Sequence, residues 1–124
     1  MEINMDVHGT NVAFRIGGLS DEPDVKWLSG YTAKPGYKIL LCHHPEFYPA
    51  IRKETGESMD IIVSGHAHGG QWRLFGRGLY APGQGFLPRY TSGCHGNMVI
   101  SRGVANTASV PRLGNPPEIP VLKL

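Results

Sequence analysis

The sequence contains few cysteines, no long hydrophobic run and almost no net charge. Only 2 of its 124 residues are cysteines, Cys42 and Cys94, which are too few for a disulfide framework. No apolar run approaches the roughly 20 residues that a membrane-spanning helix needs, and the formal net charge of +2 gives no indication of nucleic-acid binding. We therefore expect no disulfide-stabilised fold, no transmembrane segment in this chain and no nucleic-acid partner.

The composition is that of one globular domain. Hydrophobic residues make up 40% of the chain and charged residues 18%, which are ordinary values. The 17 glycines and 10 prolines indicate many turns, but the apolar runs between them argue against disorder. Because residues 1–4 do not resemble a signal peptide, we expect a cytoplasmic location, with Cys42 reduced and buried in a strand.

The most informative segment is 65–71 (GHAHGGQ), which follows the apolar run 60–64. In extended backbone, residues two positions apart point to the same side, so His66 and His68 would lie together. Neutral imidazole is the commonest protein ligand of transition metals. The segment therefore predicts half of a metal site.

A second apolar run, 38–42, also ends in histidine, at His43 and His44. Residues 46–55 between the two runs have helical character despite Pro49, and Gly56 is a suitable C-cap. A strand, a helix and a strand form a unit whose two strands are parallel. His43 would then meet His66 and His68 at the carboxyl ends of two strands, where open α/β sheets bind their ligands.

The rest of the chain gives a coarser pattern. We expect a hairpin of strands at 2–7 and 12–16, with residues 8–11 as its turn, and a short helix at 24–29. A long loop at 69–92 and two final strands at 97–101 and 119–124 complete the order.

Two of these segments resemble the last two metal motifs of the calcineurin-like metallophosphoesterases: 41–45 (LCHHP) and 64–71 (SGHAHGGQ). The similar branch is the bacterial one that includes enzymes acting on phospholipid-like and sugar-lipid phosphoesters. Segments 110–119 and 16–21 resemble that branch as well. The resemblance implies an α/β fold of two stacked mixed sheets with helices outside, a four-layer α/β/β/α sandwich, of which residues 1–124 would be the C-terminal half.

The three earlier motifs of that family are not present as an intact set. Gly-Asp-x-x-Asp and Gly-Asn-His followed by an acid are absent, and Asp-x-His occurs only at residues 6–8, in the expected hairpin. Residues 20–24 keep the Asp-x-x-Asp spacing through Asp21 and Asp24, either as a relic of the bridging ligand or, as we favour, as an acidic turn that starts a helix. The resemblance thus implies a partial domain. Another polypeptide could supply the first half, the chain could pair with itself, or it could be the remnant of a split gene.

The resemblance also implies a chemistry. In the family, two divalent metal ions (Mn, Fe or Zn) clamp a phosphate, and a bridging hydroxide attacks phosphorus. By position, His43 and His66 would bind one metal and His68 the other, with Gly69, Gly70 and Gln71 at the substrate. Since the bridging carboxylate and the catalytic histidine are missing, we assign no catalytic residue. Three imidazoles can also hold a single ion with one open position.

Two functions follow as hypotheses. The chain is a fragment of an enzyme that hydrolyses phosphomonoesters or phosphodiesters and is poorly active alone, or it is a non-catalytic metal-binding or interaction remnant of the same fold. By the resemblance, strand 39–42 would lack one neighbour, and an exposed apolar edge favours association. The compartment of an intact relative, cytoplasmic or membrane-associated, stays open.

Several other residues have two interpretations each. His44 is expected at a helix start or on the surface and His8 in a solvated turn, while His95 is a turn residue or approaches the site. The aromatic residues of the long loop contact a substrate or pack the loop down; they are Trp72, Phe75 and Tyr80. Three carboxylates are candidates to replace the missing bridging ligand, namely Asp21, Asp24 and Asp60.

Overall fold

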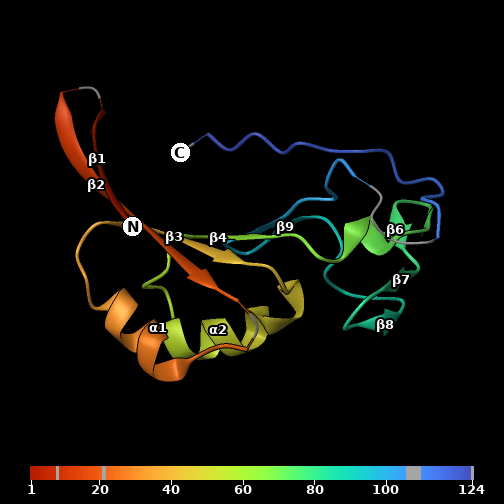
Figure 1. The fold of residues 1–124 in the computed structure, drawn as a ribbon, viewed down its shortest axis with the longest axis horizontal. Coiled ribbons are helices and arrows are strands. Elements are labelled where there is room, and N and C mark those ends of the chain that lie inside the picture. Colours follow the sequence, from red (N-terminus) through yellow and green to blue (C-terminus); the bar gives the residue numbers. More distant parts are fainter. Residues whose placement is uncertain (8, 21, 106–109, 124) are drawn as a thin grey trace.

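The computed structural model describes residues 1–7, 9–20, 22–105 and 110–123, so that the predictions for His8 and Asp21 lie outside the described residues. Six strands form one mixed sheet in the order β1-β2-β3-β4-β10-β9 (Figure 1). The four inner strands are parallel, and the edge strands β1 and β9 are antiparallel to their neighbours. The strands are β1 Glu2–Val7, β2 Thr10–Leu19, β3 Tyr37–Cys42, β4 Ile61–Ser64, β9 Gly93–His95 and β10 Met98–Ile100.

The predicted hairpin is present, but its second strand is longer than expected. β2 continues to Leu19 and pairs in parallel with β3, so β3 has β2 on one side and β4 on the other. The expectation that this strand lacks a neighbour is therefore wrong. The sequence did not predict the extension of β2 beyond residue 16, because Gly17 follows there and glycine is depleted in strands. A Cβ on Gly17 would lie 2.7 Å from the Trp27 ring, so glycine is what lets the helix that follows approach the sheet.

Helix α1 (Val25–Thr32) connects β2 to β3 and confirms the predicted short helix. Asp24 caps it by accepting the Trp27 backbone N–H at 3.0 Å, which confirms its predicted place at a helix start. Tyr31 connects the helix to β2 and β3. Its hydroxyl lies 2.5 Å from the carbonyl oxygen of Arg15 and 3.0 Å from that of Ile39.

The predicted strand, helix and strand unit is also confirmed. A short 3₁₀ turn, η1 (Pro45–Phe47), leads into helix α2 (Tyr48–Thr55), and β4 then runs parallel to β3. Pro49 does no harm because it lies in the first helical turn, where backbone N–H groups have no partner within the helix. Gly56 ends the helix with a φ of 56°.

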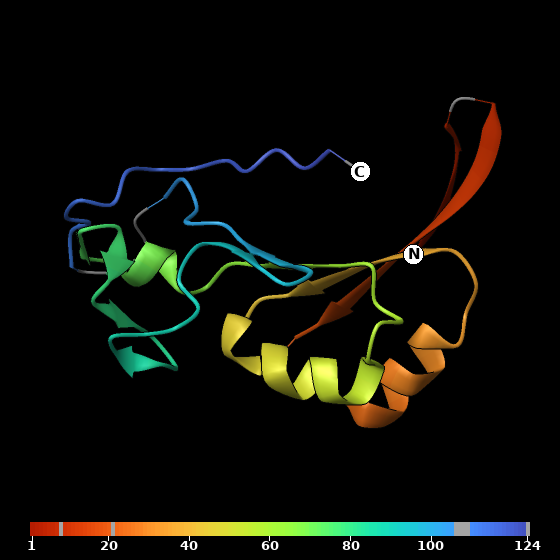
Figure 2. The same cartoon turned by 180° about the vertical axis from the view of Figure 1, so that it is seen from behind.

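Both helices cover the same face of the sheet (Figures 1 and 2). The core between helices and sheet holds Leu28, Tyr31, Leu40, Cys42, Ile51, Ile62, Met98 and Ile100. The opposite face carries Ile39, Leu41 and Val63 in register across β3 and β4, and Leu41 is 48% exposed. No helix of the described residues lies over that face. The mixed α/β class is confirmed, whereas the expected second stacked sheet is not seen in the described part of the chain.

The predicted long loop forms a separate end of the molecule, remote from the β1–β2 hairpin (Figure 1). It contains the short turn η2 (His68–Gly70) and two small ribbons. The ribbons pair β5 (Arg73–Leu74) with β6 (Arg77–Gly78), and β7 (Tyr80–Ala81) with β8 (Gly85–Phe86).

Of the two final strands expected, one is present. β10 confirms the prediction for 97–101, but residues 119–123 form no strand. Pro120 lies in that segment, and a proline has no N–H to donate to a sheet. At eight residues each, α1 and α2 are far too short to cross a membrane.

Candidate metal centre

The parallel pairing of β3 with β4 brings the two histidine motifs together at one end of the sheet. His43 and His44 follow β3, and His66 follows β4 by two residues. The Gly65 backbone N–H donates to the His43 carbonyl at 3.3 Å. The Nε2 atom of His43 lies 3.1 Å from Nδ1 of His66, so the imidazole nitrogens of the two motifs face each other.

A carboxylate joins the histidines. His44, Glu46 and His66 each offer a ligand atom, and these three atoms lie within 4.8 Å of one another. Oε1 of Glu46 is 3.0 Å from Nδ1 of His44. Oε2 of Glu46 is buried without a hydrogen-bond partner among the described residues. An unpaired buried carboxylate oxygen is costly in a folded protein, so this oxygen is available to a hydrogen-bond donor or to a cation.

His68 lies beside this group without being part of its most compact set. It lines a cavity of about 320 Å³ together with His66. The structure therefore places His43 next to His66, and His66 and His68 on one cavity.

Sequence reasoning missed Glu46 and underestimated His44. His44 does stand at a helix start, as the N-cap residue of η1, but its half-buried side chain also turns toward His66, with ring centroids 4.1 Å apart. The signal was present in the spacing His44-Pro45-Glu46. A carboxylate two residues after a histidine, at the start of a helix that follows a strand, reaches the same edge of the sheet.

The backbone of the histidine loop is strained. His66, His68 and Gln71 have φ values of 53°, 47° and 44°, in the left-handed region that side chains rarely adopt. Such strain persists only where the surrounding structure imposes it, and it concentrates at functional sites. Three such residues within six positions support a functional role for this loop.

The C-terminal tail holds the loop in this shape. The Asn115 side-chain amide donates to the His68 carbonyl at 2.5 Å and to the Gln71 carbonyl at 3.3 Å. Gly69 between them has a φ of 69°, and a Cβ on it would overlap the Asn115 side chain. Any larger residue at this position would push the tail away from the histidines.

The predicted substrate-binding residues have clear packing roles. Gly69 and Gly70 are buried, the second against Gly78 of the β5–β6 ribbon. Gln71 is 7% exposed, and its side-chain amide donates to the Val110 carbonyl. Gln71 also lines the cavity beside His66, so it stays a candidate for substrate contact.

The two histidines of the loop are held in their neutral form. Burial is the largest cause that lowers the pKa of His66, and the neighbouring imidazoles of His44 and His43 lower it further. Burial also lowers the pKa of His68, followed by the positive charge of Arg112. Neutral imidazoles have the lone pair that a metal would need, and the lowered pKa values favour this form of both side chains near neutral pH.

The other candidate carboxylates serve the fold. Asp24 caps α1, and Asp60 accepts the Lys38 backbone N–H at 2.7 Å. Asp60 immediately precedes β4, at the opposite end of the strand from His66. Among the described acidic residues, Glu46 is therefore the one that the structure brings into the histidine cluster.

The remaining candidates lie elsewhere. His95 belongs to β9, with Nε2 3.2 Å from the Ser92 carbonyl oxygen, and it lines a separate cavity. Cys42 is buried and free, as predicted, and burial raises its pKa, while Cys94 is exposed. Trp72 and Tyr80 line the cavity beside the histidines, whereas Phe75 is 96% exposed and does not pack the loop down.

The segment that contains the histidine loop is rich in arginine and lacks acidic residues. Between residues 61 and 117 the sequence has no Asp or Glu, but it has five arginines, which are Arg73, Arg77, Arg89, Arg102 and Arg112. A region with this excess of positive charge attracts anions. In the structure Arg73, Arg77 and Arg89 line a separate cavity and Arg102 pairs with Glu118, so Arg112 is the one of the five whose charge acts on His68.

Comparisons with known proteins give two partial sequence similarities. No family model matches the chain, and no solved structure matches it. The uncharacterized protein YpbG of Bacillus subtilis (strain 168) is 36% identical over 86 residues, which are 69% of this chain and 30% of that protein. An uncharacterized metallophosphoesterase of Aquifex aeolicus (strain VF5) is 28% identical over 123 residues, which are 96% of this chain and 42% of that protein.

The chain thus spans less than half the length of these two relatives. The second similarity is distant, but it extends over nearly all of the chain. It suggests a relationship to metallophosphoesterases at the level of the superfamily.

Proposed function

We propose that this chain binds a divalent transition metal ion and forms the metal-binding part of a phosphoester hydrolase. The observation that carries the proposal is the 3.1 Å separation between Nε2 of His43 and Nδ1 of His66. Two ligands at about 2.0–2.1 Å from one tetrahedral ion lie roughly 3.3 Å apart. The pair, which is at hydrogen-bond distance in this structure, is also close to the spacing that a shared ion requires.

Four side chains make up the proposed ligand set: His43, His66, His68 and Glu46. His44, whose ligand atom also lies within 4.8 Å of those of Glu46 and His66, is assigned the role of orienting Glu46. Glu46 is included because its Oε2 is buried without a hydrogen-bond partner among the described residues. Its other oxygen, Oε1, contacts Nδ1 of His44. Carboxylates that bind metals are commonly oriented by such a second partner. In this arrangement Glu46 supplies the negative charge that the family's missing bridging aspartate would bring. Three imidazoles and one carboxylate suit Zn²⁺, Fe²⁺ or Mn²⁺.

A divalent ion bound there would supply Lewis acidity toward a phosphoryl oxygen. The chain itself would attract the phosphoester through the positive charge of Arg112, which acts on His68, with Gln71 on the cavity wall as the proposed substrate contact. In the reaction, a water oxygen bonds to phosphorus, the ester P–O bond breaks, and the alcohol leaves with a proton. The described residues include no second set of ligands for another ion beside this cluster, so we expect the isolated chain to be a poor catalyst.

A complementing polypeptide would complete the enzyme. The two relatives are more than twice as long as the part that matches this chain, and one face of the sheet carries exposed apolar residues such as Leu41. An apolar sheet face is stable when another layer covers it. We propose that a segment with the three earlier family motifs packs there and brings its ligands to the histidine cluster.

Calorimetric titration with Zn²⁺ and Mn²⁺ tests the metal site. We expect one ion per chain, a loss of at least about a hundredfold in affinity in His66→Ala, and about tenfold in Glu46→Gln. His95→Ala is the matched control, because this histidine lies in β9 and lines a different cavity. Equal affinity in the wild type and His66→Ala would overturn the proposal. An unchanged affinity in Glu46→Gln would remove the carboxylate from the ligand set.

A further inference from the structure

The cavity beside His66 and His68 has a wall of unusual composition. Its volume is about 320 Å³, near the small end of the roughly 300–1,000 Å³ typical of ligand pockets. Apart from the two histidines and Gln71, the lining is aromatic or aliphatic, and it consists of Trp72, Tyr80, Pro82, Phe86 and Val110.

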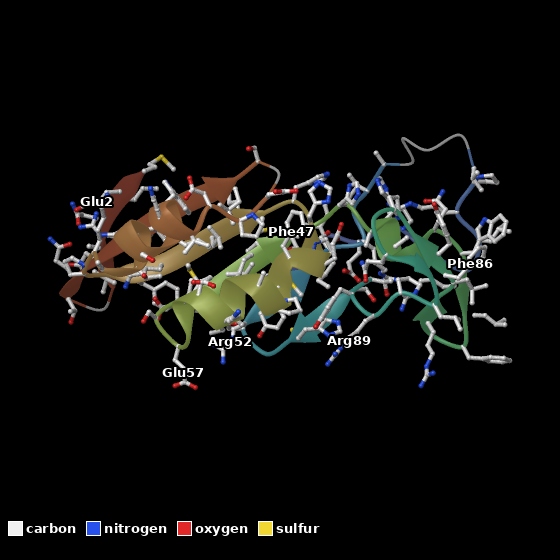
Figure 3. The ribbon with its side chains drawn as sticks, turned by 90° about the horizontal axis from the view of Figure 1, so that it is seen from below. Glu2, Phe47, Arg52, Glu57, Phe86 and Arg89 are labelled. Carbon is white, nitrogen blue, oxygen red and sulfur yellow. The ribbon has the colours of Figure 1, made fainter. Side chains whose placement is uncertain are left out.

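These apolar side chains are exposed rather than packed in a core. Trp72 is 42% exposed, Tyr80 45% and Phe86 83%. Tyr80 and Phe86 meet edge to face across the β7–β8 ribbon, with ring centroids 5.5 Å apart. Figure 3 shows Phe86 at the ribbon end of the molecule, far from Glu2 at the hairpin end. A cluster of exposed aromatic rings around a cavity marks a binding surface.

The wall is also held in place. The Trp72 indole N–H donates to the Pro111 carbonyl at 3.1 Å, and the Leu79 backbone N–H donates to the Trp72 carbonyl at 2.8 Å. The tail and the ribbons thus fix the Trp72 ring on one side of the cavity. Rigid aromatic groups bind apolar ligands at little cost in conformational entropy.

We propose that this cavity binds the apolar, aryl or alkyl, group of a phosphoester whose phosphate lies at the histidine cluster. The inference rests on the proposed function, which places the phosphate, and it adds the class of substrate. The argument is one of adjacency, because His66 and His68 line the same cavity as the aromatic rings. A ligand anchored there by its anionic end has the apolar wall within reach of its other end. A sugar or another strongly hydrated group would gain little from such a wall and would lose its water contacts.

The test uses phosphonates, which carry the same anionic head but are not hydrolysed. In the presence of Zn²⁺, phenylphosphonate and hexylphosphonate are compared with methylphosphonate by calorimetric titration of the full chain. Burying a phenyl-sized group is expected to tighten binding by about tenfold or more relative to methyl. The phenyl and hexyl arms distinguish an aromatic from an aliphatic group.

Two variants of the wall and one control locate the effect. Phe86→Ser and Trp72→Ala should each remove most of the preference for the apolar phosphonates. Phe75→Ser is the matched control, because Phe75 lies on the same loop and is 96% exposed but does not line the cavity. The exposure of Phe86 makes misfolding of Phe86→Ser a minor concern, and circular dichroism checks it.

Trp72 supplies a second, independent signal. The chain has 2 tryptophans, and the other, Trp27, stacks on Tyr31 in α1. In a Trp27→Phe background, tryptophan emission therefore reports on the cavity. Hexylphosphonate should shift this emission, and methylphosphonate should not.

The outcomes separate the two proposals. If Zn²⁺ binds but the three phosphonates bind equally, the apolar substrate class is overturned and the metal site stands. If Zn²⁺ does not bind while hexylphosphonate still shifts Trp72 emission, the proposed function fails and the apolar cavity stands. A preference that persists in Phe86→Ser and Trp72→Ala, or disappears in Phe75→Ser, would also overturn the assignment to this wall.

Discussion

The Asn115 side-chain amide lies 2.5 Å from the carbonyl oxygen of His68, so a residue of the C-terminal tail holds the loop that presents the histidines. The contact joins positions 47 residues apart in the sequence. Asn115 is 4% exposed, which shields the hydrogen bond from competing water. The tail is thereby a structural part of the proposed metal centre.

Replacing Asn115 by alanine is expected to loosen this loop. The carbonyl groups of His68 and Gln71 would lose their donor, at a cost of about 1–3 kcal/mol in the free energy of unfolding. Because the proposed ligand His68 would be less well placed, Zn²⁺ affinity should fall about tenfold. Denaturant unfolding and calorimetric titration measure the two effects.

Asn97→Ala is the matched control for this variant. The Asn97 amide donates to the Met59 carbonyl at 2.5 Å, and its oxygen accepts the Tyr48 hydroxyl at 3.1 Å, away from the loop. This change should lower stability and leave metal affinity unchanged. If both variants lost metal affinity equally, Asn115 would have no special role at the centre.

Metal affinity should decrease on acidification. An unperturbed imidazole has a pKa of about 6.5, and burial lowers the pKa values of His66 and His68 below this. Both stay neutral above about pH 6.5, so affinity should be nearly constant there. As pH falls below that value and through their lowered pKa values, protons compete for the ligand nitrogens and Zn²⁺ affinity declines. Titration at several pH values checks this, and an affinity that rises on acidification would contradict it.

The stability of the metal-free chain should also decrease as pH falls. In the unfolded chain these histidines take up protons at their ordinary pKa, whereas the folded chain resists protonation. Their contribution to stability is therefore present above about pH 6.5 and is lost as pH falls through the lowered pKa values of the folded state. Replacing His66 by alanine should flatten this part of the stability profile, which thermal unfolding at several pH values can measure.

Catalysis by the isolated chain should be weak. We expect hydrolysis of bis-p-nitrophenyl phosphate barely above a metal-only control, because a second ion and a catalytic histidine each contribute orders of magnitude in rate. Addition of a polypeptide with the three earlier motifs should raise the metal-dependent rate. Robust turnover by the chain alone that disappears in His68→Ala would show that the chain is complete as an enzyme. Metal binding without activity in the complemented complex would favour a non-catalytic metal-binding module.

Association is expected through the open face of the sheet. Leu41 is 48% exposed on that face, so Leu41→Lys should shift the chain from dimers or larger species toward monomers. Leu74→Lys is the control, because Leu74 is 54% exposed in the β5–β6 ribbon, away from this sheet. Light scattering distinguishes the species, and a stable wild-type monomer at high concentration would argue that the face needs no cover.

Much of the framework follows from local patterns. The apolar runs before His43 and His66, with a helical segment between them, are enough to predict parallel strands, and parallel strands end at the same edge. The encounter of His43 with His66 was therefore predictable. The helix start at Asp24 and the helix end at Gly56 were predictable as well, because capping depends on a few adjacent residues.

Other features depend on residues that are distant in the sequence. β2 continues through Gly17 because β3 and the rings of α1 stabilise it there, although glycine weakens strand propensity locally. The segment 119–123 has apolar residues typical of a strand, but it pairs with no strand of the described chain. At Gly17 long-range contacts outweigh local preference, whereas at 119–123 Pro120 removes a donor and no neighbouring strand of the described chain supplies a partner.

The chemistry of the site divides in the same way. Histidine spacing is a property of a continuous segment, so the sequence reveals His66 and His68 as candidates on its own. Their backbone, however, is left-handed and not extended as predicted. The unpaired oxygen of Glu46, the anchoring of the loop by Asn115 and the aromatic wall at Trp72 and Phe86 arise where separate segments meet. These depend on burial and on the direction of side chains in three dimensions, which a linear pattern does not encode.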